Sequence, residues 1–249
     1  MFDISKPWPA GLNRRTALPI FAGLVALIFA LWWVDAPLSR LAQGLPQPVV
    51  GFFGWITDYG LSDWILYPSL IFWFVCTVLA RLGNKRTAKL ALKQMAGIFG
   101  FIFLGVGLPG LISNLTKSAI GRARPPLMDT VGSLDFHPIF NNFIYESFPS
   151  GHTTTAFAFC FVMSFLSPRL FPFMLIFSAA IGLSRIVVGA HYPTDVLGGI
   201  VLGTLGAYLM RNIFAARRWV FERTPSGNIV MRPPAAVLRL IRGRRSAKR

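Results

Sequence analysis

Long stretches without a charged residue alternate along the chain with short segments that hold nearly all of its Lys, Arg, Asp and Glu. A charge near the centre of a lipid bilayer is costly, so each uncharged stretch is a candidate membrane-spanning helix. Six such stretches occur, at residues 16–34, 64–80, 94–116, 153–168, 170–184 and 196–210. Each of the last three gives about 23 Å of helix, which is short for a hydrocarbon core of about 30 Å. Because the arginines beside them can reach the interface with long side chains, we expect all six to span the membrane.

The distribution of the basic residues predicts the orientation of these helices. If the N-terminus is cytoplasmic, twenty of the 25 Lys and Arg residues lie inside and seven of the nine Asp and Glu residues lie outside. An excess of Lys and Arg marks the cytoplasmic side of membrane proteins. The sequence therefore predicts an all-α, six-transmembrane helical bundle with both termini in the cytoplasm. Residues 1–215 form the membrane domain, and residues 216–249 form a basic cytoplasmic tail.

The composition agrees with a lipid-embedded protein and narrows the partners. The chain is 54% hydrophobic and only 14% charged, with a mean hydropathy of +0.56. A net charge of +16 on a soluble protein would indicate nucleic acid, but in a membrane protein it marks the cytoplasmic face, so we expect no nucleic-acid partner. The basic tail either binds anionic lipids of the inner leaflet or serves only to retain the topology. The first apolar stretch lacks a small-residue cleavage site, so we expect it to remain as an anchor.

The two cysteines and the acidic residues do not predict a disulfide or a metal site. Cys76 and Cys160 both fall within predicted spans. No cluster of carboxylates or histidines has a spacing typical of Mg²⁺ or Zn²⁺ ligands. We therefore expect neither a metal nor another cofactor.

Three cations follow the third span, on the outer side where cations are otherwise scarce. Lys117, Arg122 and Arg124 lie within eight residues of one another. A contact with lipid headgroups would explain them, but charges placed against the general bias more strongly indicate a ligand.

The fourth span opens with Pro149, Ser150, Gly151 and His152. Ser is a common N-cap, and the free N–H groups of a helix start can bind an anion. A cap alone does not explain His152, because the positive end of the helix dipole disfavours an imidazolium there. A purely structural histidine is the alternative.

The fifth span ends at Arg185, and His191 and Asp195 follow across a short turn. Asp195 either caps the sixth span or accepts a hydrogen bond from the imidazole, which would leave the other ring nitrogen more basic. Two of the three histidines, three of the five outer cations and one carboxylate thus meet at helix ends on one face. Cations and helix N–H groups can hold a phosphate, while one histidine attacks phosphorus and another protonates a leaving oxygen.

Taken together, these residues resemble the three-part signature of the type 2 phosphatidic acid phosphatase superfamily. The matching blocks lie at 117–125, 149–152 and 184–195. They read Lys117-x6-Arg124-Pro125, Pro149-Ser150-Gly151-His152 and Ser184-Arg185-x5-His191-x3-Asp195. The resemblance implies an integral membrane enzyme that hydrolyses a lipid phosphate monoester without a metal, through a phosphohistidine intermediate.

The resemblance also implies a role for each residue. His191 would attack phosphorus, Asp195 would orient it, and His152 would protonate the leaving alkoxide and then activate water. The phosphoryl oxygens would be held by Lys117, Arg124, Ser150, Gly151 and Arg185. Arg122 lies outside the signature and is either an additional phosphate contact or a solvated loop cation.

Three functional alternatives remain open at this point. Vanadate-dependent haloperoxidases share the constellation, but they are soluble and six spans argue against them. A lipid-binding or translocating membrane protein on the same scaffold is the non-enzymatic alternative. Among lipid phosphates we favour a phosphate of lipid A, because the outer loop between residues 126 and 148 is aromatic and lies beside cations. Phosphatidylglycerol phosphate, undecaprenyl diphosphate and phosphatidate are the other candidates. By analogy we place the chain in a bacterial inner membrane with its site facing the periplasm.

Overall fold

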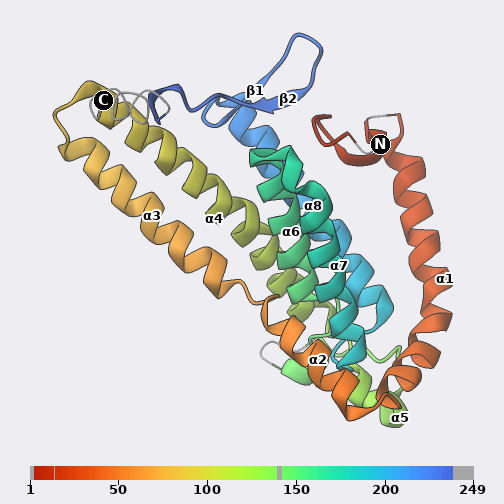
Figure 1. The fold of residues 1–249 in the computed structure, drawn as a ribbon. Helices are drawn as coiled ribbons and strands as arrows, with labels where there is room; N and C mark the ends of the chain where they lie inside the picture. Colours follow the sequence, from red (N-terminus) through yellow and green to blue (C-terminus); the bar gives the residue numbers. More distant parts are fainter. Residues whose placement is uncertain (1–2, 14, 139–141, 238–249) are drawn as a thin grey trace.

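The computed structural model describes residues 3–13, 15–138 and 142–237, and this part of the chain is mostly helical (Figure 1). Its α-helices are α1 (Ala17–Gln43), α2 (Gln47–Asp58), α3 (Asp63–Leu82), α4 (Arg86–Ile120), α5 (Met128–Val131), α6 (Gly151–Leu166), α7 (Phe171–Val187) and α8 (Pro193–Ala216). Short 3₁₀ turns lie at Pro9–Gly11, Pro125–Leu127, Phe143–Tyr145 and Pro168–Leu170. After α8, the strands β1 (Phe221–Arg223) and β2 (Ile229–Met231) pair antiparallel, with Glu222 opposite Val230.

Each of the six predicted stretches lies in a different helix, namely α1, α3, α4, α6, α7 or α8. Within the described residues, four segments are long and apolar enough to cross a membrane: Gln47–Leu82, Arg86–Ile120, Pro168–Val187 and Pro193–Ala216. Helix α1 adds a fifth if its two halves, which meet at 48°, count as one span. Helix α6 is apolar but shorter. The chain is thus an integral membrane protein with four or five spans by this criterion.

Helix α2 was not predicted from the sequence. It begins directly after Pro46 and is separated from α3 by a turn at residues 59–62. In this turn the backbone of Gly60 lies against α6, because a Cβ at Gly60 would come within 2.8 Å of the Cβ of His152. The turn therefore brings the end of α2 next to the start of α6.

Helix α6 forms the centre of the bundle and packs against α4, α7 and α8. Its approach to α8 is close because α8 presents glycines at this contact. A Cβ at Gly199 would lie 2.7 Å from the carbonyl oxygen of Ser150, and one at Gly203 would lie 2.4 Å from that of Thr154. Small residues are the usual means by which membrane helices approach each other. The packing fixes the first turn of α6 beside the first turn of α8.

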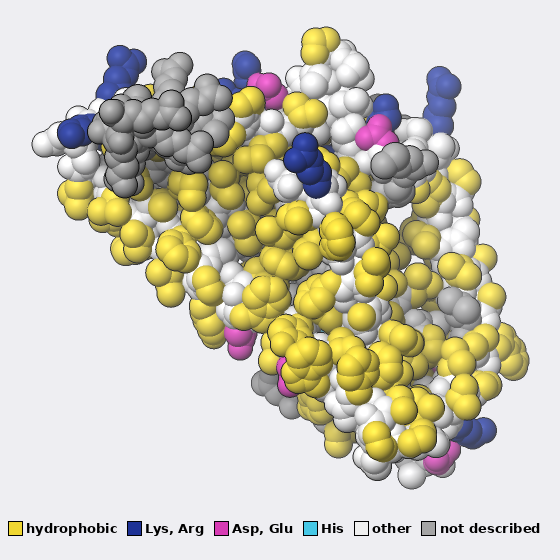
Figure 2. All heavy atoms as spheres, in the orientation of Figure 1, with side chains coloured by type: hydrophobic (Ala, Val, Ile, Leu, Met, Phe, Trp, Pro, Cys, Tyr) yellow, Lys and Arg dark blue, Asp and Glu magenta, His cyan; other side chains and the backbone are white. Residues whose placement is uncertain are grey.

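The two ends of the bundle are polar, and hydrophobic side chains cover the face between them (Figure 2). At one end the N-terminal segment is bound to α8 and β2. Arg211 donates hydrogen bonds to the carbonyl oxygens of Ile4 and Lys6, and the N–H of Ile229 donates to Ser5 at 2.8 Å. At the opposite end lie α2, α5 and the loop that joins α4 to α6 (Figure 1).

Candidate active site

The three sequence blocks meet at the end of the bundle that lies opposite the N-terminal segment. Helix α4 ends at Gly121, which has a positive φ of 64° and which no larger residue could replace, because a Cβ would overlap the backbone of His137. The following residues pair with the rest of the loop. The N–H of Arg124 donates to Ile144 at 2.9 Å, and the N–H of Ser147 donates to Arg122 at 3.1 Å. The loop between α4 and α6 is thereby folded back over the starts of α6 and α8.

Lys117 and Arg185 are buried cations on the last turns of α4 and α7. The ammonium of Lys117 lies over the start of α6, at 3.2 Å from the position that a Cβ at Gly151 would occupy. Arg185 donates one hydrogen bond to the hydroxyl of Thr57 at 2.7 Å, and its buried Nε has no hydrogen-bond partner among the described residues. Helix α2 thus supplies the partner that positions Arg185.

Arg124 is the third buried cation, and its partners are backbone carbonyls. It donates to Phe143 at 2.8 Å, to Glu146 at 3.1 Å and to Ala190 at 3.3 Å. Burial lowers the pKa of Arg124. Among the described residues, neither Arg124 nor the two other buried cations forms an ion pair with a carboxylate. Because buried cations are stable only when they are paired or solvated, this end of the bundle is suited to an anion.

Ser150 caps the N-terminus of α6. Its hydroxyl accepts hydrogen bonds from the N–H of Thr153 at 3.5 Å and from the Thr153 hydroxyl at 2.9 Å, and its own N–H donates to the carbonyl of Asp195 at 2.9 Å. Gly151 and His152 follow in the first turn, where backbone N–H groups have no partner within the helix. The start of α6 is therefore joined to α8 and directs N–H groups at the space near Lys117.

His191 precedes α8, and Asp195 lies in its first turn. The two side chains are fully buried, and Nδ1 of His191 lies 3.6 Å from Oδ2 of Asp195, just beyond hydrogen-bonding distance. Asp195 also caps α8, because Oδ2 accepts the N–H of Tyr192 at 2.8 Å. Asp195 thus caps α8 and also lies beside the imidazole of His191. The two roles, which the sequence left as alternatives, do not exclude each other.

Burial keeps the His191 imidazole neutral. It lowers the pKa of His191 to about 4, and the negative charge of Asp195 opposes the shift. A neutral imidazole has a free nitrogen lone pair at neutral pH, as a nucleophile requires.

A cavity of about 400 Å³ connects the polar groups to the apolar helices. Its polar end is formed by Lys117, Gly151 and His152. Its apolar part is formed by α3 and α4, with Leu66, Val106, Gly107, Gly110 and Leu111. The cavity has the polarity that an amphiphile with an anionic head requires.

Arg122 does not behave as the sequence suggested. Only 3% of it is exposed, so the interpretation as a solvated loop cation is wrong. All five of its side-chain N–H groups are directed at protein oxygens, on Asp35, Ser133, Thr194 and Asp195. No donor is left for a phosphate, and we therefore do not retain Arg122 as a phosphate contact.

Sequence reasoning missed Asp35 as a site residue, although one signal was available. We used Asp35 only as the charge that ends the first uncharged stretch. In the structure α1 continues past it to Gln43, and the carboxylate is fully buried. A buried acid in a membrane helix requires a partner, and Arg122 is that partner, at 2.8 Å.

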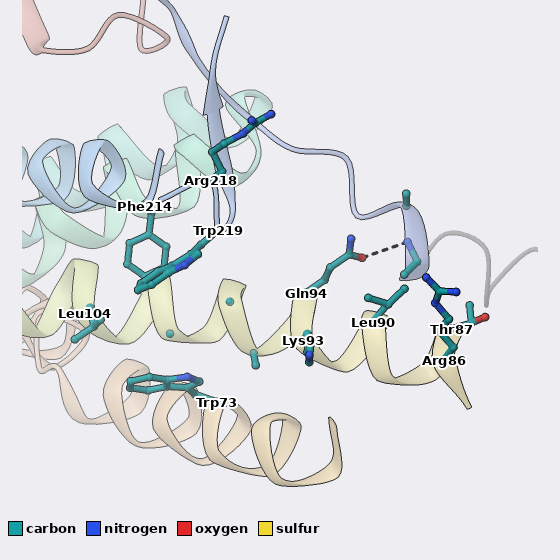
Figure 3. Close-up of a pocket in the computed structure, with 15 residues that line it drawn as sticks. Trp73, Arg86, Thr87, Leu90, Lys93, Gln94, Leu104, Phe214, Arg218 and Trp219 are labelled. Carbon is teal, nitrogen blue, oxygen red and sulfur yellow. Dashed lines mark hydrogen bonds between the residues drawn. The ribbon is translucent and has the colours of Figure 1, made fainter. Parts of the chain in front are cut away.

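A second cavity, of about 840 Å³, lies near the other end of the bundle (Figure 3). It is formed by α3, α4, the end of α8 and the segment at Ala236, whose N–H donates to Gln94 at 3.2 Å. Trp73, Leu104 and Trp219 contribute apolar surface there. None of the candidate catalytic or phosphate-binding residues lines it, so size alone does not identify the active site.

Comparison with known proteins gives consistent results. The model of the PAP2 superfamily matches residues 98–219. The chain is 34% identical over 208 residues to a lipid A 1-phosphatase of Rhizobium johnstonii, and the match covers 84% of each protein. It is 33% identical over 155 residues to the undecaprenyl-diphosphatase BcrC of Bacillus subtilis, covering 62% of this chain and 69% of that protein. The crystal structure of a transmembrane PAP2 type phosphatidylglycerolphosphate phosphatase from Bacillus subtilis has the same fold, with a TM-score of 0.51 at 22% identity, covering 79% of this chain and 94% of that one.

Proposed function

The chain belongs to the PAP2 superfamily and is a membrane lipid phosphate phosphatase, and we propose that its substrate is lipid A carrying a phosphate monoester. The observation that carries the phosphatase chemistry is the group of three buried cations, next to two histidines, that pair with no carboxylate of the described residues. The choice of lipid A is supported by the relative named lipid A 1-phosphatase, which is similar over 84% of its length.

The proposed reaction has two steps. In the first, a ring nitrogen of His191 attacks phosphorus, the bond between phosphorus and the lipid oxygen breaks, and His152 gives its proton to that oxygen. In the second, His152 takes a proton from water, the water oxygen attacks phosphorus, and the bond to His191 breaks. Asp195 orients His191 and stabilises the positive charge that its ring carries in the intermediate.

Phosphoryl transfer depends on positioning and on neutralising the equatorial oxygens. We assign this task to Lys117, Arg124 and Arg185, together with the hydroxyl of Ser150 and the N–H of Gly151. The three cations are buried, so they can neutralise a phosphate in surroundings less polar than water, where electrostatic interactions are strong.

We also propose that the reaction needs no metal. Within residues 3–13, 15–138 and 142–237, no group of three or more His, Cys, Asp or Glu has an arrangement that could hold a metal ion. The test is to measure phosphate release in excess chelator with and without added Mg²⁺. Restoration of lost activity by Mg²⁺ would overturn this part of the proposal.

The proposed topology has six spans, both termini in the cytoplasm and the active site at the periplasmic face of a bacterial inner membrane. Helix α6 would be the fourth of these spans, and it is short because its start lies in the site rather than at the surface. Residues 1–215 would be the catalytic membrane domain. Of the tail at 216–249, residues 238–249 lie outside the described part of the chain, and its binding to anionic lipids stays a proposal.

The substrate assignment can be tested directly. The purified protein in lipid nanodiscs would be given lipid A, phosphatidylglycerol phosphate, undecaprenyl diphosphate and phosphatidate, and kcat/KM for phosphate release would be measured for each. Mass spectrometry of total lipids from a deletion strain would show which species gains one phosphate. We expect lipid A in both experiments. A preference of tenfold or more for another lipid would refute the assignment but not the phosphatase activity.

A further inference from the structure

Three charged groups form a continuous buried cluster behind His191. Arg122 donates to Oδ1 of Asp195 at 2.6 Å and to Oδ2 of Asp35 at 2.8 Å. Both carboxylates are fully buried. The cluster contains two negative charges and one positive charge, so Asp195 belongs to a buried group with one net negative charge.

Asp35 and Arg122 are held in place from several directions. Asp35 accepts the N–H of Thr194 at 3.0 Å and also the hydroxyl of that residue. The guanidinium of Arg122 lies 4.2 Å from the centre of the Tyr192 ring. Thr194 directly precedes Asp195 and Tyr192 lies three residues before it, so both charges of the pair act on the turn that positions it.

Asp195 has little freedom in this arrangement. Its Oδ1 is bound to Arg122, and its Oδ2 accepts the hydroxyl of Ser147 at 2.6 Å and the N–H of Tyr192 at 2.8 Å. The remaining neighbour of Oδ2 is Nδ1 of His191. Arg122 neutralises part of the negative charge of Asp195. The remaining part is what attracts a positive charge on the imidazole of His191.

We propose that Asp35 and Arg122 are positioning residues that together set how strongly Asp195 attracts a positive charge on His191. Asp35 draws part of the charge of Arg122 away from Asp195, which leaves Asp195 effectively more negative. This role rests on the proposed function of His191 as nucleophile, because phosphorylation places a positive charge on its ring. Asp35 lies 87 residues from Arg122 in the sequence and belongs to none of the three blocks.

Removal of the two charges has opposite expected effects. In Asp35→Asn, Arg122 interacts with Asp195 alone, the attraction for imidazolium weakens, and His191 titrates at lower pH. In Arg122→Gln, Asp195 loses its counter-charge and His191 titrates at higher pH. Each shift should be about one pH unit, since a unit charge acts here through a medium less polar than water. Among the described residues, Lys117, Arg124 and His152 also act electrostatically on His191, and neither variant changes them.

The experiment is an NMR titration of the protein labelled with ¹³C in its histidines. The chain has only three histidines, so the His191 signal can be assigned with His137→Asn and His152→Asn variants. The matched control is Arg211→Gln, which removes another fully buried arginine, at the far end of α8, that contacts neither carboxylate. The control should lose thermal stability without moving the His191 titration.

The result that supports the proposal is a shift to lower pH in Asp35→Asn and to higher pH in Arg122→Gln. Equal titration in wild type, both variants and control would overturn it and leave the cluster with a structural role only. If Arg122→Gln does not fold, Asp35→Asn decides alone, because Asn keeps an acceptor for Thr194. The double variant Asp35→Asn/Arg122→Gln keeps the net charge of the wild-type cluster, so its His191 should titrate close to the wild type. The titration tests the role of Asp35 and Arg122 and can be measured without turnover. Phosphate release by the wild type is a separate measurement, and it shows whether the proposed function fails.

Discussion

The contact between α6 and α8 at Gly203 determines how accurately the two histidines face each other, and Gly203→Ala tests this directly. A Cβ at this position would lie 2.4 Å from the carbonyl oxygen of Thr154 and 2.9 Å from the backbone N of Ala158. Both atoms belong to the backbone of α6 and cannot rotate away. The helices must therefore separate by about 1 Å, the difference between 2.4 Å and the 3.4 Å of an ordinary contact.

The magnitude follows from this displacement. Overpacking of this kind costs about 1–3 kcal/mol of stability, and the better helix propensity of Ala returns about 0.5–1 kcal/mol. The effect on catalysis should be larger. His152 is on the first turn of α6 and His191 directly precedes α8, so the separation moves the proposed acid away from the proposed nucleophile. A misplacement of about 1 Å can lower a rate about 10²-fold.

The assay compares kcat and the thermal midpoint of the variant with those of Gly54→Ala. Gly54 lies in α2, and a Cβ there would meet no atom of the described residues within 4 Å, so this control gains only the helix propensity. We expect Gly203→Ala to lose a few degrees in Tm and about 10²-fold in kcat, and Gly54→Ala to lose neither. Equal kcat in the two variants would show that the spacing of α6 and α8 does not limit catalysis, and the reasoning would be wrong.

The remaining predictions concern the two histidines. His191→Ala should abolish turnover while the protein stays folded and membrane-inserted, as checked by phosphate release and gel filtration; full activity would eliminate the nucleophile assignment. His152→Ala should reduce kcat far more on a lipid phosphate than on an aryl phosphate, because an aryl oxide leaves without a proton; equal losses would argue against a general acid. The buried His191 has its pKa lowered to about 4 and loses its nucleophilic lone pair as the pH falls through this value, so protonation of His191 should leave kcat/KM unchanged from neutral pH to about pH 5 and lower it below that. A decline centred near pH 6.5 would contradict this.

The helices were predictable from the sequence because charged residues are excluded from the bilayer core, and each uncharged stretch does lie in a separate helix. The same rule failed where charges are paired inside the protein. It ended the first span before Asp35, although α1 continues to Gln43 around that buried carboxylate. We also did not assign α2, although most of it lies in the uncharged residues 41–57, because Pro46 and Pro48 interrupt that stretch.

The three motif blocks of the site were visible in the sequence, but the order of residues does not reveal which groups they pair with. Lys117, Arg122 and Arg124 lie on one segment, and nothing in their spacing separates a phosphate ligand from a positioning residue. The distinction depends on contacts with residues far away in the chain. Among the described residues, Arg124 is bound by backbone carbonyls and the Phe143 ring but by no carboxylate, whereas Arg122 is bound by two carboxylates.

The chemistry of the site therefore depends on a division of charge that Asp35 brings about. Without Asp35, Arg122 would cancel the charge of Asp195, and the imidazole of His191 would lie among cations with no compensating negative charge. With Asp35, the cluster behind His191 keeps one net negative charge while the cations in front remain free to hold a phosphate. A nucleophile that becomes positively charged as it attacks an anion needs both conditions at once, because the cations that attract the anion also oppose a positive charge on the ring.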